Sequence, residues 1–339
     1  MEQIIGMTMS KIYYKASEFY DDIKILREEG VHRGINVGFS TLDDFYNKKL
    51  GRCTYIYSAP FSGKSQFAFE LSINSASAYN WITAVYSPES GTKEEIVAKL
   101  VFMITGKQLY AKHKNSIDEE LLKSAMSFIN DHFIFIDPDN PHVDDIYENA
   151  MLTLLDFYRC VKQAESYYGI SIQETLIDPF NELAHDFSKD EGRQDLYIER
   201  MLGIARRDAK INLRHNTIVT HVVDQQIERK GDIRYYPPAM PRELAGGQAW
   251  YRKGDMMASL WRPPFGLKDA EGRDWEENEM HVIIQKVKPE YCGKRGTAIL
   301  FFDMETGRYY ERINGKNYYA FQYQKHIDAL EKQHQILIK

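Results

Sequence analysis

One short segment restricts the fold of this chain more than any other. Residues 55–57 are an apolar run of strand length, a tight loop follows, and apolar residues at helical spacing continue after residue 64. The loop ends in Gly63-Lys64-Ser65, the end of the phosphate-binding pattern G-x-x-x-x-G-K-[ST]. In such loops backbone N–H groups and the helix N-terminus face the phosphates. The Lys reaches the β- and γ-phosphates, and the Ser hydroxyl binds Mg²⁺. This order of strand, loop and helix predicts a nucleotide site in an α/β fold.

The loop departs from the pattern at its first position, where Ser58 replaces glycine. A side chain there narrows the range of backbone angles, so an ordinary strand–turn–helix with a chance Gly-Lys-Ser is the alternative. The strand–loop–helix context favours the nucleotide. The residues expected to surround it are Ser58, Ala59, Pro60, Phe61, Ser62, Gly63, Lys64, Ser65 and Gln66.

Composition limits the class of protein and its partners. The 339 residues suffice for one large or two ordinary domains. The net charge is −6, so any contact with nucleic acid needs a local basic patch or an assembled ring. The three cysteines are far apart in sequence, form no metal-binding pattern, and are simplest to explain as reduced cytoplasmic thiols. We expect no membrane association, because no apolar run approaches the roughly 18 residues of a membrane span. We also expect no signal peptide, because the first residues lack its apolar core and cleavage site.

Polar residues follow three runs of β-forming residues, in positions where ligands bind to α/β sheets. The runs are 82–87, 175–177 and 217–220. Glu89, just past the first run, could polarise the water that attacks a γ-phosphate, or it could be a solvated loop residue. Asp178 closes the second run, where enzymes with phosphate loops hold Mg²⁺. His221 closes the third, where it could contact the γ-phosphate or serve the structure alone.

Periodicity predicts the other elements. Helices are expected at 11–29, 64–78, 92–105, 117–130, 143–167, 195–213 and 320–335. Further strands are expected at 132–136, 255–262, 280–288 and 297–302, with loops at 184–194 (exposed and mobile) and 224–241. The pair Gly246-Gly247 predicts either a flexible loop or a close approach of backbone to a ligand.

In their order and spacing, these motifs resemble the RecA-like motor domain of DnaB-type replicative helicases, including Twinkle and phage primase-helicases. The resemblance covers residues 31–312. It is carried by Gly38 to Asp43 (the first motif of the family), Ser58 to Ser65 (the phosphate loop), Tyr86 to Glu89, Ile177-Asp178, His221, Leu244 to Gln248 with Asp255, and Lys286 to Lys288. It implies a RecA-like P-loop NTPase core: a mainly parallel central sheet flanked by helices, with antiparallel strands near the C-terminus.

The resemblance also implies the roles of the site residues. Ser65 and Asp178 would hold the Mg²⁺ of ATP, and Glu89 would act as the base. Lys288 stands where the family has an arginine finger that reaches the ATP of a neighbouring subunit, and Arg295 is the alternative finger. The catalytic residues implied are Glu89, Lys64, His221, Lys288, Lys286 and Arg295. Those implied to contact DNA are Arg242, Gly246, Gly247 and Gln248.

These expectations combine into one domain plan. We expect a leader or linker helix (1–30) that docks on another copy or packs on its own domain, a motor domain (31–312), and a helical tail (313–339), without a primase domain. The function implied is an ATP-dependent helicase ring, by family likeness a hexamer, moving on single-stranded DNA in a bacterial or phage-infected cell. A primase or polymerase would be its partner. The alternatives are a RecA-like recombinase or recombination mediator that forms filaments, and a regulatory ATP-binding module of the helicase-loader type.

Overall fold

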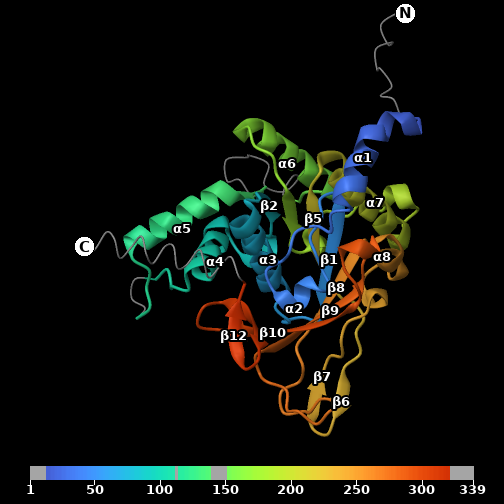
Figure 1. Ribbon diagram of the computed structural model, residues 1–339. Helices are drawn as coiled ribbons and strands as arrows, with labels where there is room; N and C mark the ends of the chain where they lie inside the picture. Colours follow the sequence, from blue (N-terminus) through green and yellow to red (C-terminus); the bar gives the residue numbers. More distant parts are fainter. Residues whose placement is uncertain (1–12, 111–113, 139–150, 321–339) are drawn as a thin grey trace, which may run out of the picture. The chain divides into compact units, whose positions relative to one another are not determined.

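A computed structural model describes residues 13–110, 114–138 and 151–320 of the chain (Figure 1). The chain forms two compact units, one ending at Arg33 and the other beginning at Gly34. The described part of the first unit is a single turn, η1 (Ala16–Phe19), that continues into helix α1 (Tyr20–Glu29). No residue of η1 or α1 is buried, and the apolar side chains of Phe19, Ile23 and Leu26 are exposed.

The second unit is organised around a sheet that contains ten strands in its described part. The strand order is β12-β11-β10-β9-β8-β1-β5-β4-β2-β3. The strands from β8 to β3 in this order run parallel, and those from β9 to β12 are antiparallel. The bounds are β1 Arg52–Ser58, β2 Thr83–Tyr86, β3 Phe133–Phe135, β4 Glu174–Ile177, β5 His215–His221, β8 Met256–Trp261, β9 Glu279–Lys286, β10 Gly296–Asp303, β11 Arg308–Ile313 and β12 Lys316–Tyr319. This architecture confirms the predicted fold class.

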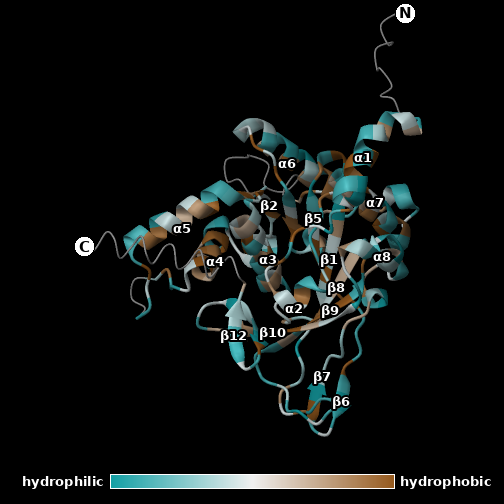
Figure 2. Ribbon diagram, in the orientation of Figure 1, coloured by the Kyte–Doolittle hydropathy of each residue, from teal (hydrophilic) through white to brown (hydrophobic). Residues whose placement is uncertain are grey.

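Helices cover both faces of the sheet (Figure 1), and the buried apolar residues form one core cluster on each face. Figure 2 shows hydrophobic residues, in brown, on α4 and along the central strands. Strand β1 supplies both, because successive side chains of a strand point to opposite faces: Ile56 enters one core, whereas Tyr55 and Tyr57 enter the other. Helices α3, α4 and α5 pack on the first face, and α6, α7 and α8 on the second. Their bounds are α3 Lys64–Tyr79, α4 Lys93–Thr105, α5 Glu119–His132, α6 Leu154–Tyr168, α7 Gln194–Asn212 and α8 Gln248–Lys253, with the short α2 at Ser40–Asp43.

Side-chain caps set where several helices begin. Thr92 accepts a hydrogen bond from the N–H of Glu95, and the carboxylate of Glu95 accepts one from the N–H of Thr92, so α4 starts with a capping box. Thr153 caps α6 through the N–H of Asp156. The helix expected at 143–167 therefore begins at 154 in the described chain, and residues 143–150 lie outside the described residues.

One loop assignment needs correction. Within the expected loop 224–241, β6 (Glu228–Lys230) and β7 (Ile233–Tyr235) form a hairpin around Gly231, whose positive φ suits a tight turn. The loop expected at 184–194 is exposed at most of its positions, as predicted, and it contains the turn η4 (Ser188–Asp190). Asp190 is buried there, with an oxygen 2.5 Å from the Arg200 guanidinium.

The C-terminal part also differs from expectation. Two strands were expected to end the sheet, yet β11 and β12 follow them, so the predicted helical tail from 313 is wrong for residues 313–319. The reason is the pair Asn314-Gly315, with φ of 51° and 75°, which favours the tight turn of a hairpin. Most of the helix expected at 320–335 lies outside the described residues.

Candidate nucleotide site

The phosphate loop joins the end of β1 to the start of α3. Phe61 and Gly63 both have left-handed backbone conformations, with φ of 59° and 81°. Left-handed residues of this kind help turn successive backbone N–H groups toward an anion. A Cβ on Gly63 would lie 2.7 Å from the Tyr309 hydroxyl, which itself donates to the carbonyl of Gly63 at 3.3 Å. Glycine is therefore required here by both backbone angle and space.

Ser58 fits the loop without strain at the position of the pattern's first glycine. It is the last residue of β1, pairs with His221 of β5, and is not among the described residues with positive φ. Its hydroxyl donates to the carbonyl of Ala59 at 2.8 Å, and the Ser62 hydroxyl donates to the same carbonyl at 3.0 Å. The departure from the pattern therefore does not disturb the backbone that a phosphate would face.

Lys64 is the cation of the loop. Its ammonium is buried and donates to the Ala59 carbonyl at 3.3 Å. Burial lowers the pKa of Lys64, while the negative charges of Asp178 and Glu89 oppose that shift. The nearby carboxylates thus help keep a buried ammonium charged where phosphates would bind.

Ser65 and Asp178 form an oxygen site beside Lys64. The hydroxyls of Ser65 and Ser87 donate to the two carboxylate oxygens of Asp178, at 3.1 and 3.0 Å respectively. A hydroxyl beside a carboxylate suits Mg²⁺, which commonly takes one or two protein oxygens together with substrate phosphates. In the part of the chain that the structure describes, no group of three or more His, Cys, Asp and Glu side chains could hold a metal ion without such help. The site therefore fits a Mg²⁺ ion that arrives with a nucleotide.

Glu89 and His221 meet above this site. Glu89 lies in the turn η2 (Pro88–Ser90) after β2, and His221 ends β5. Their facing atoms, Oε2 and Nε2, are 3.3 Å apart, and both side chains are partly exposed. Because β1, β5, β4 and β2 are successive neighbours, the structure brings Lys64, Ser65, Glu89, Asp178 and His221 to one edge of the sheet.

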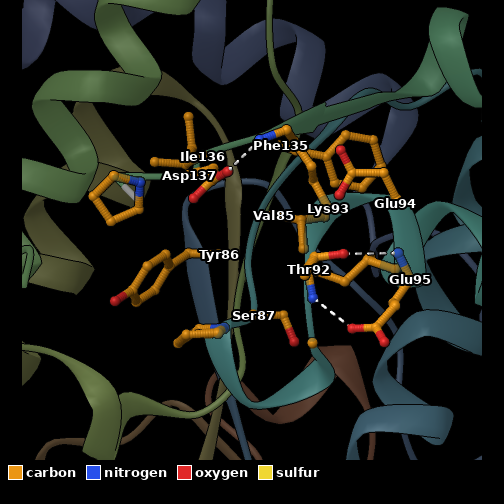
Figure 3. A pocket seen from close by; sticks show the side chains of 14 residues that line it. Val85, Tyr86, Ser87, Thr92, Lys93, Glu94, Glu95, Phe135, Ile136 and Asp137 are labelled. Atoms are coloured by element: carbon orange, nitrogen blue, oxygen red, sulfur yellow. Dashed lines mark hydrogen bonds and ion pairs between the residues drawn. The ribbon is translucent and has the colours of Figure 1, made fainter. Parts of the chain in front are cut away.

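A cavity of about 430 Å³ widens this edge where β2 and β3 end (Figure 3). Ser87, Thr92 and Asp137 are among its lining residues, and Lys93 forms an ion pair with Asp137 at 3.0 Å. The cavity opens at the carboxyl ends of parallel strands, which is where ligands of α/β sheets bind.

Two polar residues of this region did not stand out in the sequence. Ser87 could have been found from its place at the end of β2, just before Pro88. Lys99 resembles a surface lysine of α4, yet its ammonium lies 4.9 Å from the centre of the Phe69 ring. Burial lowers its pKa, and the charge of Asp178 opposes that shift. Lys99 thus brings a second cation into the electrostatic environment of the oxygen site.

The three predicted finger residues line a separate groove of about 830 Å³, together with Tyr251, Arg252 and Lys294. Strand β9 ends at Lys286, so Lys288 lies beyond the strand, although the strand was expected to continue to residue 288. Lys288 precedes Pro289, which has no N–H to extend the ladder. Lys288 and Arg295 are at least partly exposed.

Lys286 is held within the chain. Its ammonium donates to the carbonyls of Tyr251 and Arg252 in α8 and lies 5.0 Å from the centre of the Tyr251 ring. Burial is the main cause that lowers its pKa to about 8. Lys286 therefore stabilises the last turn of α8, whereas Lys288 and Arg295 reach solvent.

The register of the sheet separates this groove from the phosphate loop of the same chain. Lys286 pairs with Met257, which pairs with Tyr55, and Tyr55 precedes Ser58 by three residues. Strand spacings place Lys286 about 10 Å along the sheet and about 10 Å across it from Ser58. Because β9 runs antiparallel to β8, the chain leads farther from the loop after Lys286.

The predicted DNA-contacting residues form a tight turn at the start of α8. Gly246 has φ of 79°, and a Cβ there would lie 2.7 Å from the side chain of Ile198 in α7. Gly247 also has positive φ, and its N–H donates to the Leu244 carbonyl at 2.7 Å. The glycine pair therefore packs closely on α7, and its expected close approach to a ligand stays a prediction. Arg242 and Gln248 are exposed on either side of it.

The phosphate loop after a central strand, followed by polar residues at the ends of the neighbouring parallel strands, defines the class as a RecA-like P-loop fold. Solved structures share it. One solved ATPase domain superposes with a TM-score of 0.64 at 19% identity, covering 87% of this chain and 99% of that one. A DnaB-like replicative helicase, described with its interactions with primase, superposes with a TM-score of 0.63 at 19% identity, covering 88% of this chain and 67% of the other.

Sequence comparison indicates the same group of proteins. The Twinkle homolog protein, chloroplastic/mitochondrial, of Arabidopsis thaliana is 24% identical over 315 residues, 90% of this chain. The chain spans 40% of the length of that relative. No protein-family model matches it. Together these findings confirm the resemblance to the DnaB and Twinkle group that was inferred from the strand ends. Within the described residues, no helix is long and apolar enough to cross a membrane.

Proposed function

We propose that residues 31–312 form the motor domain of an ATP-driven, ring-forming replicative helicase that moves on single-stranded DNA. One observation carries the proposal: a phosphate loop, two carboxylates and a histidine from four separate segments meet at one edge of the sheet, which supports ATP hydrolysis there. The similarity to DnaB-like and Twinkle proteins supports it.

The chemistry follows from the side chains. The loop N–H groups and Lys64 bind the β- and γ-phosphates. Ser65 and Asp178 would hold Mg²⁺, which neutralises phosphate charge when bound. Glu89 orients the attacking water and accepts its proton. His221, 3.3 Å from Glu89, contacts the γ-phosphate and responds when it leaves.

The groove supports hydrolysis at subunit interfaces. Lys288 and Arg295 reach solvent and lie far from their own phosphate loop, so a role at ATP requires the ATP of another copy. A cation supplied in this way stabilises charge in the transition state. Exposed apolar side chains on α1 are consistent with an interface, and we propose that they dock on another copy in a homo-oligomeric ring, by family likeness a hexamer. We further propose that Arg242, Gln248 and the Gly246-Gly247 turn face the DNA phosphates, and that a primase or polymerase is the partner.

DNA-dependent ATP turnover tests this function. The helicase proposal expects phosphate release that single-stranded DNA stimulates, and closed rings under the electron microscope with an ATP analogue and DNA. Filaments on DNA would favour the recombinase. Binding of ATP with negligible turnover, with or without DNA, would favour the regulatory module and contradict the helicase.

A further inference from the structure

The end of β5 depends on a side chain from outside the strand. Strand β4 pairs with β5 only as far as Ile177 and Ile218, whereas β5 continues to His221. On the side of β1 the last residues of β5 keep their partners. On the side of β4 the described ladder ends three residues too early to hold His221.

Asn181 takes the place of the missing ladder. Its side-chain oxygen accepts hydrogen bonds from the backbone N–H of His221 at 3.0 Å and from the Thr220 hydroxyl at 3.1 Å. Because a backbone N–H can only donate, the accepting atom is the amide oxygen rather than its nitrogen. One atom therefore fixes both the backbone and a side chain at the strand end that carries His221.

Asn181 also has a fixed place relative to the oxygen site. It lies in the turn η3 (Phe180–Glu182), three residues after Asp178. Phe180, beside it, packs edge-to-face on Trp250 with ring centres 5.5 Å apart, so the turn is anchored in the core. The same rigid turn thus sets the positions of Asp178 and, through Asn181, of His221.

We propose that Asn181 is a positioning residue for ATP hydrolysis. It acts through His221 by keeping that imidazole within reach of Glu89 and of the γ-phosphate. The inference rests on the proposed function, because it assigns His221 to the phosphate. A positioning role and a purely structural role of Asn181 predict different results. If Asn181 positions His221, its loss should slow the chemical step, whereas a purely structural role predicts weaker ATP binding or an unfolded sheet.

Three variants separate these roles. Asn181→Leu is close in size and removes the acceptor, Asn181→Asp keeps an acceptor oxygen, and Thr220→Val removes one of the two donors. For Asn181→Leu we expect kcat to fall about 10–100-fold, the range for loss of an orienting partner, with unchanged affinity for a fluorescent ATP analogue. Asn181→Asp should recover most of the turnover, and Thr220→Val should lose less than Asn181→Leu, because the N–H of His221 keeps its partner.

A double-variant cycle tests whether Asn181 acts through His221. If it does, Asn181→Leu combined with His221→Ala should be no slower than His221→Ala alone. Multiplying defects, unchanged kcat in Asn181→Leu, or equal inactivity of the Asp and Leu variants would each overturn the assignment. So would loss of ATP affinity together with a lower melting temperature. Absence of ATP turnover in the unmodified protein is a different result: it would remove the proposed function, and this assignment with it.

Discussion

At the scale of single residues, Lys64 has the least replaceable position. Its side chain is buried, its ammonium donates to the Ala59 carbonyl, and the negative charges of Asp178 and Glu89 act on it. Lys64→Ala should abolish ATP turnover, because it removes the cation expected to contact the β- and γ-phosphates. Phosphate release and thermal unfolding, measured on the same preparation, check this. A well-folded variant that hydrolyses ATP normally would contradict the nucleotide site.

Glu89 allows a separation of binding from chemistry. Glu89→Gln keeps the size of the side chain but cannot accept a proton from water. We expect ATP to bind as before and turnover to fall by about 10²–10⁴-fold, the range for a positioned general base. Equilibrium titration and single-turnover hydrolysis measure the two quantities. If affinity falls in parallel with turnover, Glu89 supports the structure rather than the reaction.

Some site residues could be predicted from the sequence and others could not, for a physical reason. Glu89, Asp178 and His221 stand at or just after the ends of apolar runs, so strand chemistry alone marks them. The role of Asn181 can be recognised only once the unequal lengths of β4 and β5 are known. The contacts of Lys286 with carbonyls of α8 likewise depend on the folded structure. Contacts set by register and packing leave no local pattern in a sequence.

At the scale of elements, α3 carries a carboxyl group that should give a pH signature. Glu70 is buried and accepts a hydrogen bond from the backbone of Tyr309 in β11, and burial raises its pKa from the ordinary 4.5 to about 7. The folded state therefore holds this proton more tightly than the unfolded state, and the resulting stability is present below pH about 4.5 and lost as the pH rises through about 7. Glu70→Gln should remove this loss. Denaturant unfolding from pH about 4 to about 8 should show the variant gaining on the unmodified protein as pH rises. An identical pH dependence of both proteins would refute it.

The turn before α8 gives a stability prediction with a matched control. Gly246→Ala must accept a positive φ and a contact with Ile198, whereas Gly169→Ala, at the end of α6, accepts a positive φ with no atom within 4 Å. We expect Gly169→Ala to cost about 1 kcal/mol and Gly246→Ala about 1–3 kcal/mol more, the range for overpacking. Chemical denaturation measures both. Equal costs would show that the turn is looser than its packing indicates.

The strand pattern also shows what sequence analysis can miss at this scale. Asn314-Gly315 is a hairpin signal flanked by aromatic residues, and the polar character of the surrounding segment concealed it. The helix starts at 64, 93 and 154 follow from a phosphate loop and two threonine caps. Local chemistry of this kind determines element ends better than hydrophobic periodicity does.

At the scale of the whole molecule, the finger residues test the assembly. Lys288→Ala or Arg295→Ala should leave ATP affinity nearly unchanged and lower turnover by about 10³-fold, as for cations supplied in trans. Lys288 would contribute less than an arginine, because its ammonium is a compact point charge without the planar fork that a guanidinium offers to two phosphate oxygens. The comparison of the two variants identifies the finger.

Mixing inactive variants gives the decisive result. Lys64→Ala and the inactive finger variant should partly restore turnover when combined, because some interfaces then join an intact loop to an intact finger. Unmodified protein, mixed with each variant singly, provides the control. If mixing restores nothing although the finger variant is inactive alone, the finger acts within its own chain and the interface model fails.

Strand β10 connects the region of a predicted finger residue with the phosphate-loop region of the same chain. The strand begins next to Arg295 and ends at Asp303, and in the turn that follows, the carbonyl of Gly307 accepts a hydrogen bond from Gln66. Eight strand residues, about 27 Å of strand, therefore lie between the reach toward a neighbour and the contact with the chain's own loop. A hydrogen-bonded strand can shift or tilt but cannot stretch. A movement of Arg295 would therefore displace the whole strand, including the turn that contacts Gln66. In the proposed assembly, a displacement of β10 at the contact with a neighbour would therefore reach the nucleotide site of the same chain.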